Sequence, residues 1–147
     1  MIQNDYIMNL HNTLKQFNEA IYWLKRSYNK CLKIGIKHNY SEDELDVLET
    51  LASRFGRTCD MLIHKVFRSI DKVELEEGGT LIDVVNRAEK RGLIDSVDEL
   101  RIMKDLRNQI VHEYISEGLV EFFEDIMKYA PKLFGIRTKI EEYCKKY

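Results

Sequence analysis

Apolar residues recur at alternating intervals of three and four over two long stretches, and no other pattern constrains the fold as strongly. In an α-helix this spacing places the side chains on one face, so each stretch predicts a long helix with one buried stripe. The first stripe consists of Ile7, Leu10, Leu14, Phe17, Ile21, Leu24, Tyr28 and Cys31. The second consists of Leu45, Leu48, Ala52, Phe55, Cys59, Leu62, Val66 and Ile70. Two long antiparallel helices are therefore expected.

Local signals mark where these helices end and where the next one begins. The stretch 35–40 breaks the first helix, and Ser41 with Glu44 forms a capping box for the second. After a flexible turn at residues 76–79, Thr80 and Asp83 cap a short third helix that closes near Gly92. The sequence thus predicts a third, shorter helix after the long pair.

The last third of the chain shows two more helical segments. Ser96, with Glu99 three residues later, begins a fourth helix that is expected to run to about Ile115. Gly118 marks the next bend, and the helix that follows contains Pro131, which is expected to kink or restart it.

Composition agrees with an all-helical chain. Only one proline and seven glycines occur in 147 residues, and helix interiors exclude both types. The chain has no internal repeat or linker, so residues 1–147 are expected to form a single domain. The predicted fold is all-α, an up-and-down bundle of four to five helices around one core.

Charge and cysteine content exclude several classes of protein. A formal net charge of −2 argues against a broad basic field for long nucleic acid, although a local basic pocket remains open. Cys31, Cys59 and Cys144 are odd in number and far apart, so buried thiols are expected instead of disulfides or a zinc site. No long apolar run indicates a signal or membrane-spanning segment, and the protein is expected to be cytoplasmic.

No metal or cofactor is expected either. The acidic run Glu74, Glu76 and Glu77 alternates with Leu75 and precedes two glycines, which favours a solvated loop over a metal site. Phosphate-binding loops, zinc-protease motifs and nucleophile elbows do not occur in the sequence.

Arg107 is the residue that most needs an explanation. On a helical wheel it falls in the middle of the apolar arc of the fourth helix, where a charge is costly unless it is paired or reaches solvent. A structural ion pair with a carboxylate on the second helix, for example Asp60, is one explanation, and a snorkelling arginine is another. A functional arginine is the third.

A polar stripe runs beside that arc, formed by Arg101, Asp105, Asn108 and His112. An arginine can bind a phosphate bidentately, and a histidine can move a proton at a ribose hydroxyl, so Arg107, Asn108 and His112 suit phosphodiester chemistry. Arg107 and His112 diverge by roughly 140° on one helix, so a symmetric dimer is expected to complete the site.

The second helix carries a further polar stripe of Arg57, Asp60 and His64, which could line the same cleft or form only a surface ion pair. Asp60 is kept as a possible orienting partner. Tyr22 and Trp23 are expected to serve packing or a partner interface, not base stacking.

The segment RNQIVHEY, Arg107 to Tyr114, resembles the R-x-x-x-x-H-x-Y motif of HEPN domains, specifically of HepT-like toxins. The segment TLIDVVNRAEKRGLI from Thr80 to Ile94 is similar to the one that precedes the motif helix in those proteins. Chain length, helix order and the position of the motif extend the likeness over nearly the whole chain.

The resemblance implies a metal-independent endoribonuclease that acts on RNA as a homodimer, with Arg107 and His112 catalytic and Asn108 beside them. It implies the toxin of a type VII-like toxin–antitoxin system, whose cognate minimal nucleotidyltransferase adds AMP to the motif tyrosine. Tyr114 matches that tyrosine, although the helical wheel alone favours Tyr114 as an aromatic residue of the core.

Two other functions remain open on the sequence. The chain could be a non-catalytic companion of a nucleotidyltransferase that binds a nucleotide or its substrate. It could also be a helical interaction module whose polar stripes form only a dimer surface.

Overall fold

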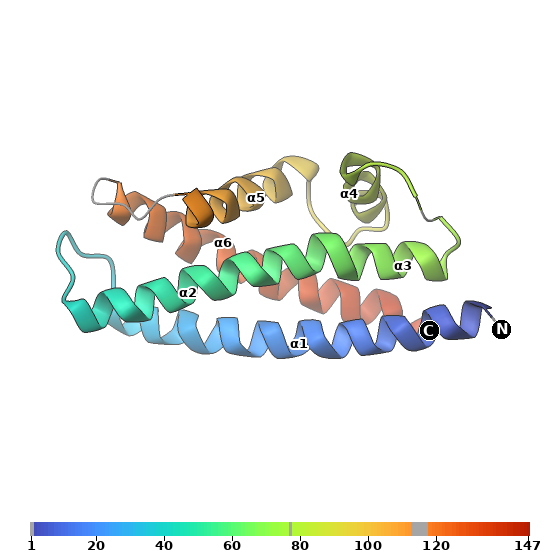
Figure 1. Ribbon diagram of the computed structural model, residues 1–147, viewed down its shortest axis with the longest axis horizontal. Coiled ribbons are helices and arrows are strands. Elements are labelled where there is room, and N and C mark those ends of the chain that lie inside the picture. The colour runs from blue at the N-terminus through green and yellow to red at the C-terminus, as the bar shows by residue number, and fades with distance from the viewer. Residues whose placement is uncertain (1, 77, 113–117) are drawn as a thin grey trace.

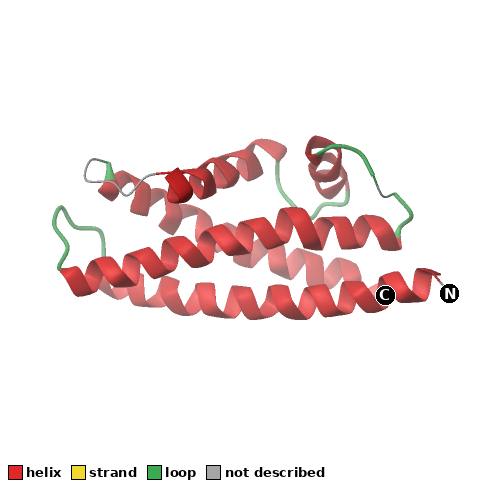
Figure 2. Ribbon diagram, in the orientation of Figure 1, coloured by secondary structure: helices red, strands yellow, loops and turns green. Residues whose placement is uncertain are grey.

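The computed structural model describes residues 2–76, 78–112 and 118–147, and for residues 110–112 it describes the helical backbone only. The described residues form helices joined by short loops and contain no strand (Figure 2). The elements are α1 (Ile2–Ile34), α2 (Glu42–Met61), the π-helical turn η1 (Leu62–Val66), α3 (Phe67–Val73), α4 (Leu81–Lys90), α5 (Val97–His112), α6 (Leu119–Tyr143) and the 3₁₀ turn η2 (Cys144–Lys146).

The helices alternate in direction, which confirms the predicted all-α, up-and-down bundle. In Figure 1 α1 and the continuous rod α2–η1–α3 run antiparallel, and α5 and α6 repeat this alternation. The short α4 lies across the end of the bundle, where it contacts α3, η1 and α5. None of the helices in the described ranges is both long enough and apolar enough to span a membrane.

The predicted helix boundaries at the first loops are confirmed. The Ser41 hydroxyl accepts from the Glu44 amide at 3.1 Å, and the Glu44 carboxylate accepts from the Ser41 amide at 3.0 Å. Thr80 and Asp83 form the same reciprocal capping box at the start of α4. Gly92 follows α4 with a φ of 78°, a left-handed conformation that favours glycine.

The second helix differs from a regular helix in one place. Its periodicity predicts an unbroken α-helix to Ile70, but a π turn is inserted at Leu62–Val66, where the Phe67 amide bonds to the Leu62 carbonyl. The rod continues through this turn to Val73. Leu62, Ile63 and Val66 stay buried on it, while His64 and Lys65 are exposed.

Pro131 does not restart the last helix, and that part of the prediction is wrong. α6 runs without interruption from Leu119 to Tyr143. A proline removes one backbone donor, but the buried Ala130, Leu133 and Ile136 on either side of it keep both halves packed on the core.

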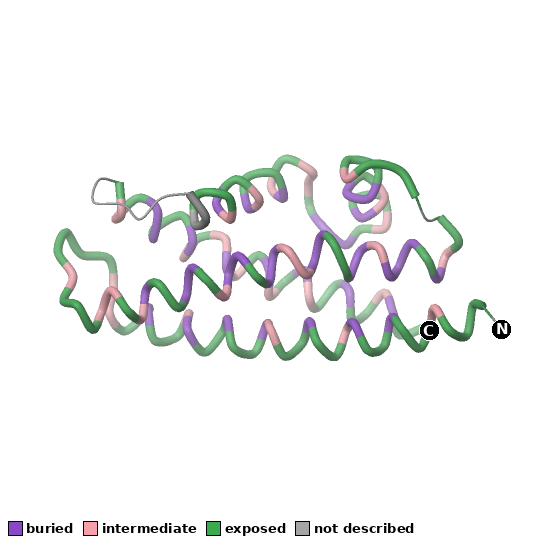
Figure 3. Tube along the Cα trace, viewed as in Figure 1, coloured by how far each residue is buried: buried purple, intermediate pink, exposed green. Residues whose placement is uncertain are grey.

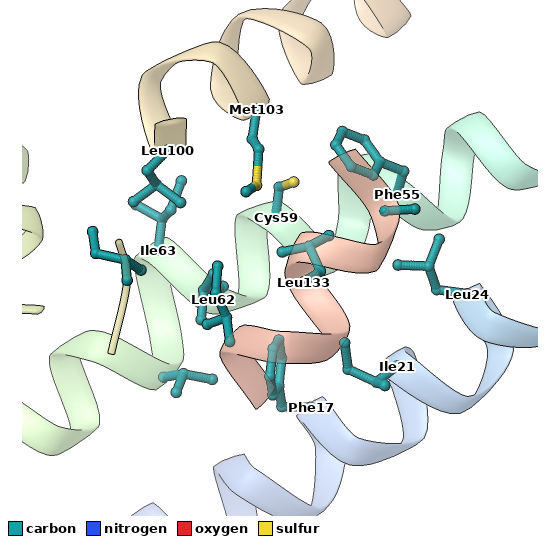
Figure 4. Close-up of a cluster of buried hydrophobic side chains, with 14 of the residues drawn as sticks. Phe17, Ile21, Leu24, Phe55, Cys59, Leu62, Ile63, Leu100, Met103 and Leu133 are labelled. Atoms are coloured by element: carbon teal, nitrogen blue, oxygen red, sulfur yellow. The ribbon is translucent and has the colours of Figure 1, made fainter. Parts of the chain in front are cut away.

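One core fills the space between the helices, and buried positions recur at intervals along the helices (Figure 3). Figure 4 shows its centre, where Phe17 from α1, Leu62 from η1 and Leu133 from α6 converge. Cys31, Cys59 and Cys144 are buried free thiols, as predicted. Burial raises the pKa of Cys31 and of Cys144 to about 11, so both stay protonated at neutral pH.

A buried ionic cluster fastens α4 and the C-terminus to α3. Asp71 is only 1% exposed and accepts hydrogen bonds from Arg87 at 2.9 Å and from Arg91 at 2.5 Å. Arg91 also bonds Glu74 at 2.8 Å, and the other oxygen of Glu74 accepts from the hydroxyls of Tyr143 and Tyr147. Here the solvated-loop prediction is wrong for Glu74, because its carboxylate joins α3, α4 and the chain end.

The surroundings of Glu74 favour its charged form. Burial alone would raise its pKa, but the hydrogen bonds from Tyr143 and Tyr147 and the charge of Arg91 outweigh burial, and the pKa of Glu74 is lowered. Burial, together with the hydrogen bond to Glu74, raises the pKa of Tyr143 to about 12. Glu74 therefore acts as a fixed anion at neutral pH.

We expect Asp71→Ala to destabilise the protein by about 3–5 kcal/mol, because it leaves two partly buried guanidinium groups without their shared carboxylate. Asp71→Asn keeps the side-chain volume and should still lose a large part of that energy. Urea denaturation followed by circular dichroism measures both. The control is Glu142→Ala, which removes an exposed partner of Lys145 and should change the free energy of unfolding by under about 0.5 kcal/mol. Equal stabilities of the Asp71 and Glu142 variants would contradict this account.

Candidate functional site: a cationic groove between α2 and α5

The buried face of α5 places Arg107 against α2. Leu100, Met103 and Leu106 are buried on that face, and α5 packs on α2 through them. Arg107 follows Leu106 directly and lies at the edge of this contact, with 29% of its side chain exposed. The arginine therefore borders the core on one side and solvent on the other.

Asp60 of α2 holds the guanidinium of Arg107. The Nε of Arg107 donates to both carboxylate oxygens of Asp60, each at 2.9 Å. The Asp60 side chain is 41% exposed, so this ion pair is open to solvent. The predicted pairing of Arg107 with a carboxylate of the second helix is confirmed, with Asp60 as that carboxylate.

The pair lies in a groove of about 570 Å³ between α2, η1 and α5. Four of the lining side chains carry a permanent positive charge, and Asp60 is the one carboxylate among the described lining residues. The cations are Arg57, Lys65, Lys104 and Arg107, and the remaining lining residues are Asn108, His64, Met61 and Ile63.

The groove brings the polar stripe of the second helix together with Arg107 and Asn108, which lie far from it in the sequence. Arg57, Asp60 and His64 come from the rod of α2 and η1, and Asn108 joins Arg107 from α5. Their convergence on one cleft, which the sequence left open, is therefore observed. Arg101 and Asp105 of the α5 stripe do not line the groove.

Two lysines of the groove were not identified from the sequence. Lys104 precedes Arg107 by three positions and so shares its helix face, a spacing that could have indicated it. Lys65 lies on the π turn, and a regular helical wheel gives no signal for the local change in twist that a π turn produces.

Two predicted site residues cannot be placed in the groove. α5 extends to His112, but the side chain of His112 lies outside the described residues, and so does Tyr114. The groove as described therefore consists of Lys104, Arg107 and Asn108 from α5 and of residues from α2 and η1.

Other chemistry at the groove is limited. Cys59 is fully buried in the core beside Asp60. Burial is the main cause that raises the pKa of its thiol far above neutral, and the negative charge of Asp60 raises it further. A nucleophilic thiolate is thus disfavoured there. Within the described ranges, no three histidine, cysteine or carboxylate side chains come together as metal ligands would.

Comparisons with known proteins found no matching family model, no matching curated protein and no matching solved structure. The fold and the site therefore define the protein by themselves, as an all-helical bundle with a cationic groove between α2 and α5.

Because the Arg107–Asp60 ion pair is partly exposed, we expect it to contribute little to the free energy of unfolding. In a double-mutant cycle of Arg107→Ala and Asp60→Ala, we expect a coupling free energy below about 1 kcal/mol, because solvent screens a half-exposed pair. Chemical denaturation of the four proteins measures it. The exposed pair Arg101–Asp98, 3.8 Å apart on α5, provides a matched cycle. A coupling well above 2 kcal/mol at Arg107 alone would favour a purely structural role.

Proposed function

We propose that the protein is a metal-independent endoribonuclease, the toxin of a HEPN and minimal-nucleotidyltransferase pair. The observation that carries the proposal is the ion pair of Arg107 with Asp60 inside a groove lined by three further cations. A phosphodiester is an anion, and a groove with this charge attracts it although the chain has a net charge of −2. The R-x-x-x-x-H-x-Y resemblance supplies the reaction class.

The geometry of Arg107 suits a phosphate. Among the described residues it donates hydrogen bonds through Nε alone, to Asp60. Its two terminal amino groups can therefore hold two phosphate oxygens while Asp60 fixes the plane of the guanidinium. In this role Asp60 is a positioning residue and Arg107 touches the substrate.

The reaction needs one proton acceptor and one proton donor. The ribose 2′-oxygen attacks the adjacent phosphorus and the bond from phosphorus to the 5′-oxygen breaks, which leaves a 2′,3′-cyclic phosphate and a 5′-hydroxyl. A base removes the 2′-hydroxyl proton, and an acid protonates the leaving 5′-oxygen. The motif assigns His112 to this proton transfer, and Asn108, which is exposed in the groove, is a candidate to orient the phosphate or the ribose.

The partners in this proposal follow from the same motif. Arg107 and His112 diverge by roughly 140° along α5, so one chain would bind the phosphate while a second chain completes the cleft. The antitoxin would be a minimal nucleotidyltransferase that adds AMP to Tyr114, the tyrosine of the motif, and so blocks the binding of RNA.

A nucleotide-binding companion of a nucleotidyltransferase is the second candidate. The groove volume of about 570 Å³ fits a bound nucleotide as well as it fits a segment of RNA, because small-molecule sites range from about 300 to 1,000 Å³. This candidate predicts nucleotide binding in the groove and no cleavage of RNA.

The deciding measurement is cleavage of mixed RNA by the purified chain in excess chelator, with analysis of the ends produced. We expect cyclic phosphate ends, and a loss of at least a hundredfold in rate in His112→Ala and in Arg107→Lys. His64→Ala tests whether the imidazole that lines the groove carries the proton instead. Arg101→Ala is the matched control, since it removes an exposed arginine of the same helix.

The outcomes separate the candidates. Cleavage that survives in both His112→Ala and Arg107→Lys would contradict the proposal. An inactive native chain that binds ATP or AMP, and loses this binding in Arg107→Ala, would establish the companion role instead.

Light scattering coupled to size-exclusion chromatography at micromolar concentration checks the dimer. We expect twice the chain mass of 17.5 kDa, because a shared cleft requires two copies. A strictly monomeric chain that still cleaves RNA would mean that a single α5 completes the site.

A further inference from the structure

The outer face of α1 carries a cluster of cations that the groove does not include. Lys25, Arg26, Lys30 and Lys33 line a shallow hollow of about 400 Å³ together with Tyr22 and Asn29. No carboxylate is among its described lining residues. A helix surface with four cations and no counter-charge is a candidate binding surface for a polyanion.

A second hollow, of about 490 Å³, lies between α1 and α2 and leads toward the groove. Trp23 lines it from α1, and Arg54 and Arg57 line it from α2, with Glu19 as the one described carboxylate. Arg57 and Met61 line both this hollow and the groove between α2 and α5. The two depressions are therefore neighbours on the surface of α2.

An aromatic pair connects the first hollow with the second. The rings of Tyr22 and Trp23 meet edge to face with centroids 5.2 Å apart. The Arg26 guanidinium, which lines the α1 hollow, is 6.0 Å from the centre of the Trp23 ring, which lines the next. The three depressions form one path from α1 across α2 to α5, which we call the basic track; these three elements follow one another in the bundle (Figure 1).

The charge of the basic track is unlike that of the whole chain. It gathers nine of the 23 lysines and arginines but, among the described residues, only two of the 25 acidic residues, Glu19 and Asp60. An even distribution would give nearly equal numbers of both. Positive charge is therefore concentrated along the basic track, although the whole chain is slightly negative.

Trp23 is held in place on this track and remains accessible. Arg54 donates to the Ser27 hydroxyl at 2.6 Å and to the Trp23 carbonyl at 3.3 Å, and its guanidinium lies 5.2 Å from the centre of the Trp23 ring. Even so, 41% of Trp23 is exposed. The part of the indole that solvent reaches, beside the Arg54 and Arg26 guanidinium groups, offers a surface on which a nucleobase can stack.

We propose that the basic track binds single-stranded RNA, with an unpaired base stacked on Trp23 and the phosphates following the cations from Lys33 to Arg107. This inference rests on the proposed function and extends it by defining the class of substrate and its path to the groove. Bases can stack on a side chain only when they are unpaired, which favours a single strand over a duplex. This proposal differs from the sequence-based expectation that Tyr22 and Trp23 serve packing or a partner interface.

The length of the basic track indicates a substrate of several nucleotides. Tyr22 to Lys33 spans about 16 Å of helix at 1.5 Å per residue. Crossing from α1 to α2 and on to α5 adds two helix spacings of about 8–10 Å each. A mononucleotide would contact only part of this path.

Trp23 is the single tryptophan of the chain, so it reports binding directly. The probe is an unstructured oligonucleotide of about 20 nucleotides with 2′-O-methyl riboses, which cannot be cleaved by attack of the 2′-oxygen. We expect it to quench Trp23 fluorescence. In anisotropy measurements with the same labelled probe, Trp23→Ala should weaken binding by about tenfold, and Trp23→Phe by less.

The lysines of α1 are tested by salt dependence. In Lys30→Gln/Lys33→Gln, the slope of log K against log salt concentration should fall by about 1.4, because each lost phosphate contact contributes about 0.7 for a single strand. The matched control is Lys72→Gln/Lys90→Gln, which removes two exposed lysines on α3 and α4, outside the basic track. This control should leave the slope unchanged.

The outcomes separate this inference from the ribonuclease proposal. Binding with Trp23 quenching but without cleavage of ordinary RNA would keep the basic track and overturn the ribonuclease. Cleavage with no effect of Trp23→Ala or of the α1 lysines would overturn the basic track alone. Equal quenching by polyglutamate, with full competition, would show a surface for an acidic protein and would also overturn it.

Discussion

The central rod α2–η1–α3 is the element on which the rest of the structure depends. It contacts α1 along its length, α5 and α6 through α2, and α4 through η1 and α3. Because it is buried on several sides at once, it must present apolar side chains over more of its circumference than a simple stripe provides. The π turn accommodates this need, since it keeps Ile63 and Val66 inside while it exposes His64 and Lys65 to the groove.

The Arg107–Asp60 pair links folding to chemistry at the groove. A fully buried ion pair would cost desolvation energy and would be closed to a ligand, whereas a fully exposed one would be too mobile to fix a guanidinium. The Arg107–Asp60 pair is partly exposed and so lies between a fully buried and a fully exposed ion pair. A structural and a functional role for Arg107 are therefore compatible. Among the described residues the guanidinium bonds only to Asp60, through Nε, so this contact orients the side chain while the outer amino groups face no described partner.

Helix positions and caps were predictable from the sequence because they depend on local spacing. The stripe from Ile7 to Cys31 and the capping box at Ser41 each involve residues three or four positions apart on one helix. The pairing of Arg107 with Asp60 was predictable only as one of several explanations. The π turn, Lys65 and the uninterrupted helix through Pro131 depend on tertiary packing, which outweighs the local preference of the chain. Glu74 was misinterpreted for the same reason, since its partners Tyr143 and Tyr147 are about seventy residues away.

The net charge was the least informative feature, and the distribution of carboxylates explains why. Asp71 and Glu74 form ion pairs with Arg87 and Arg91, so these two carboxylates are neutralised by neighbouring cations. The cations from Lys25 to Arg107 lie instead on a path that contains few carboxylates. Surface potential depends on where unpaired charge lies and not on the sum over the chain. A weakly acidic protein can therefore present a continuous cationic path to a polyanion, and the helices that build the core also determine that path.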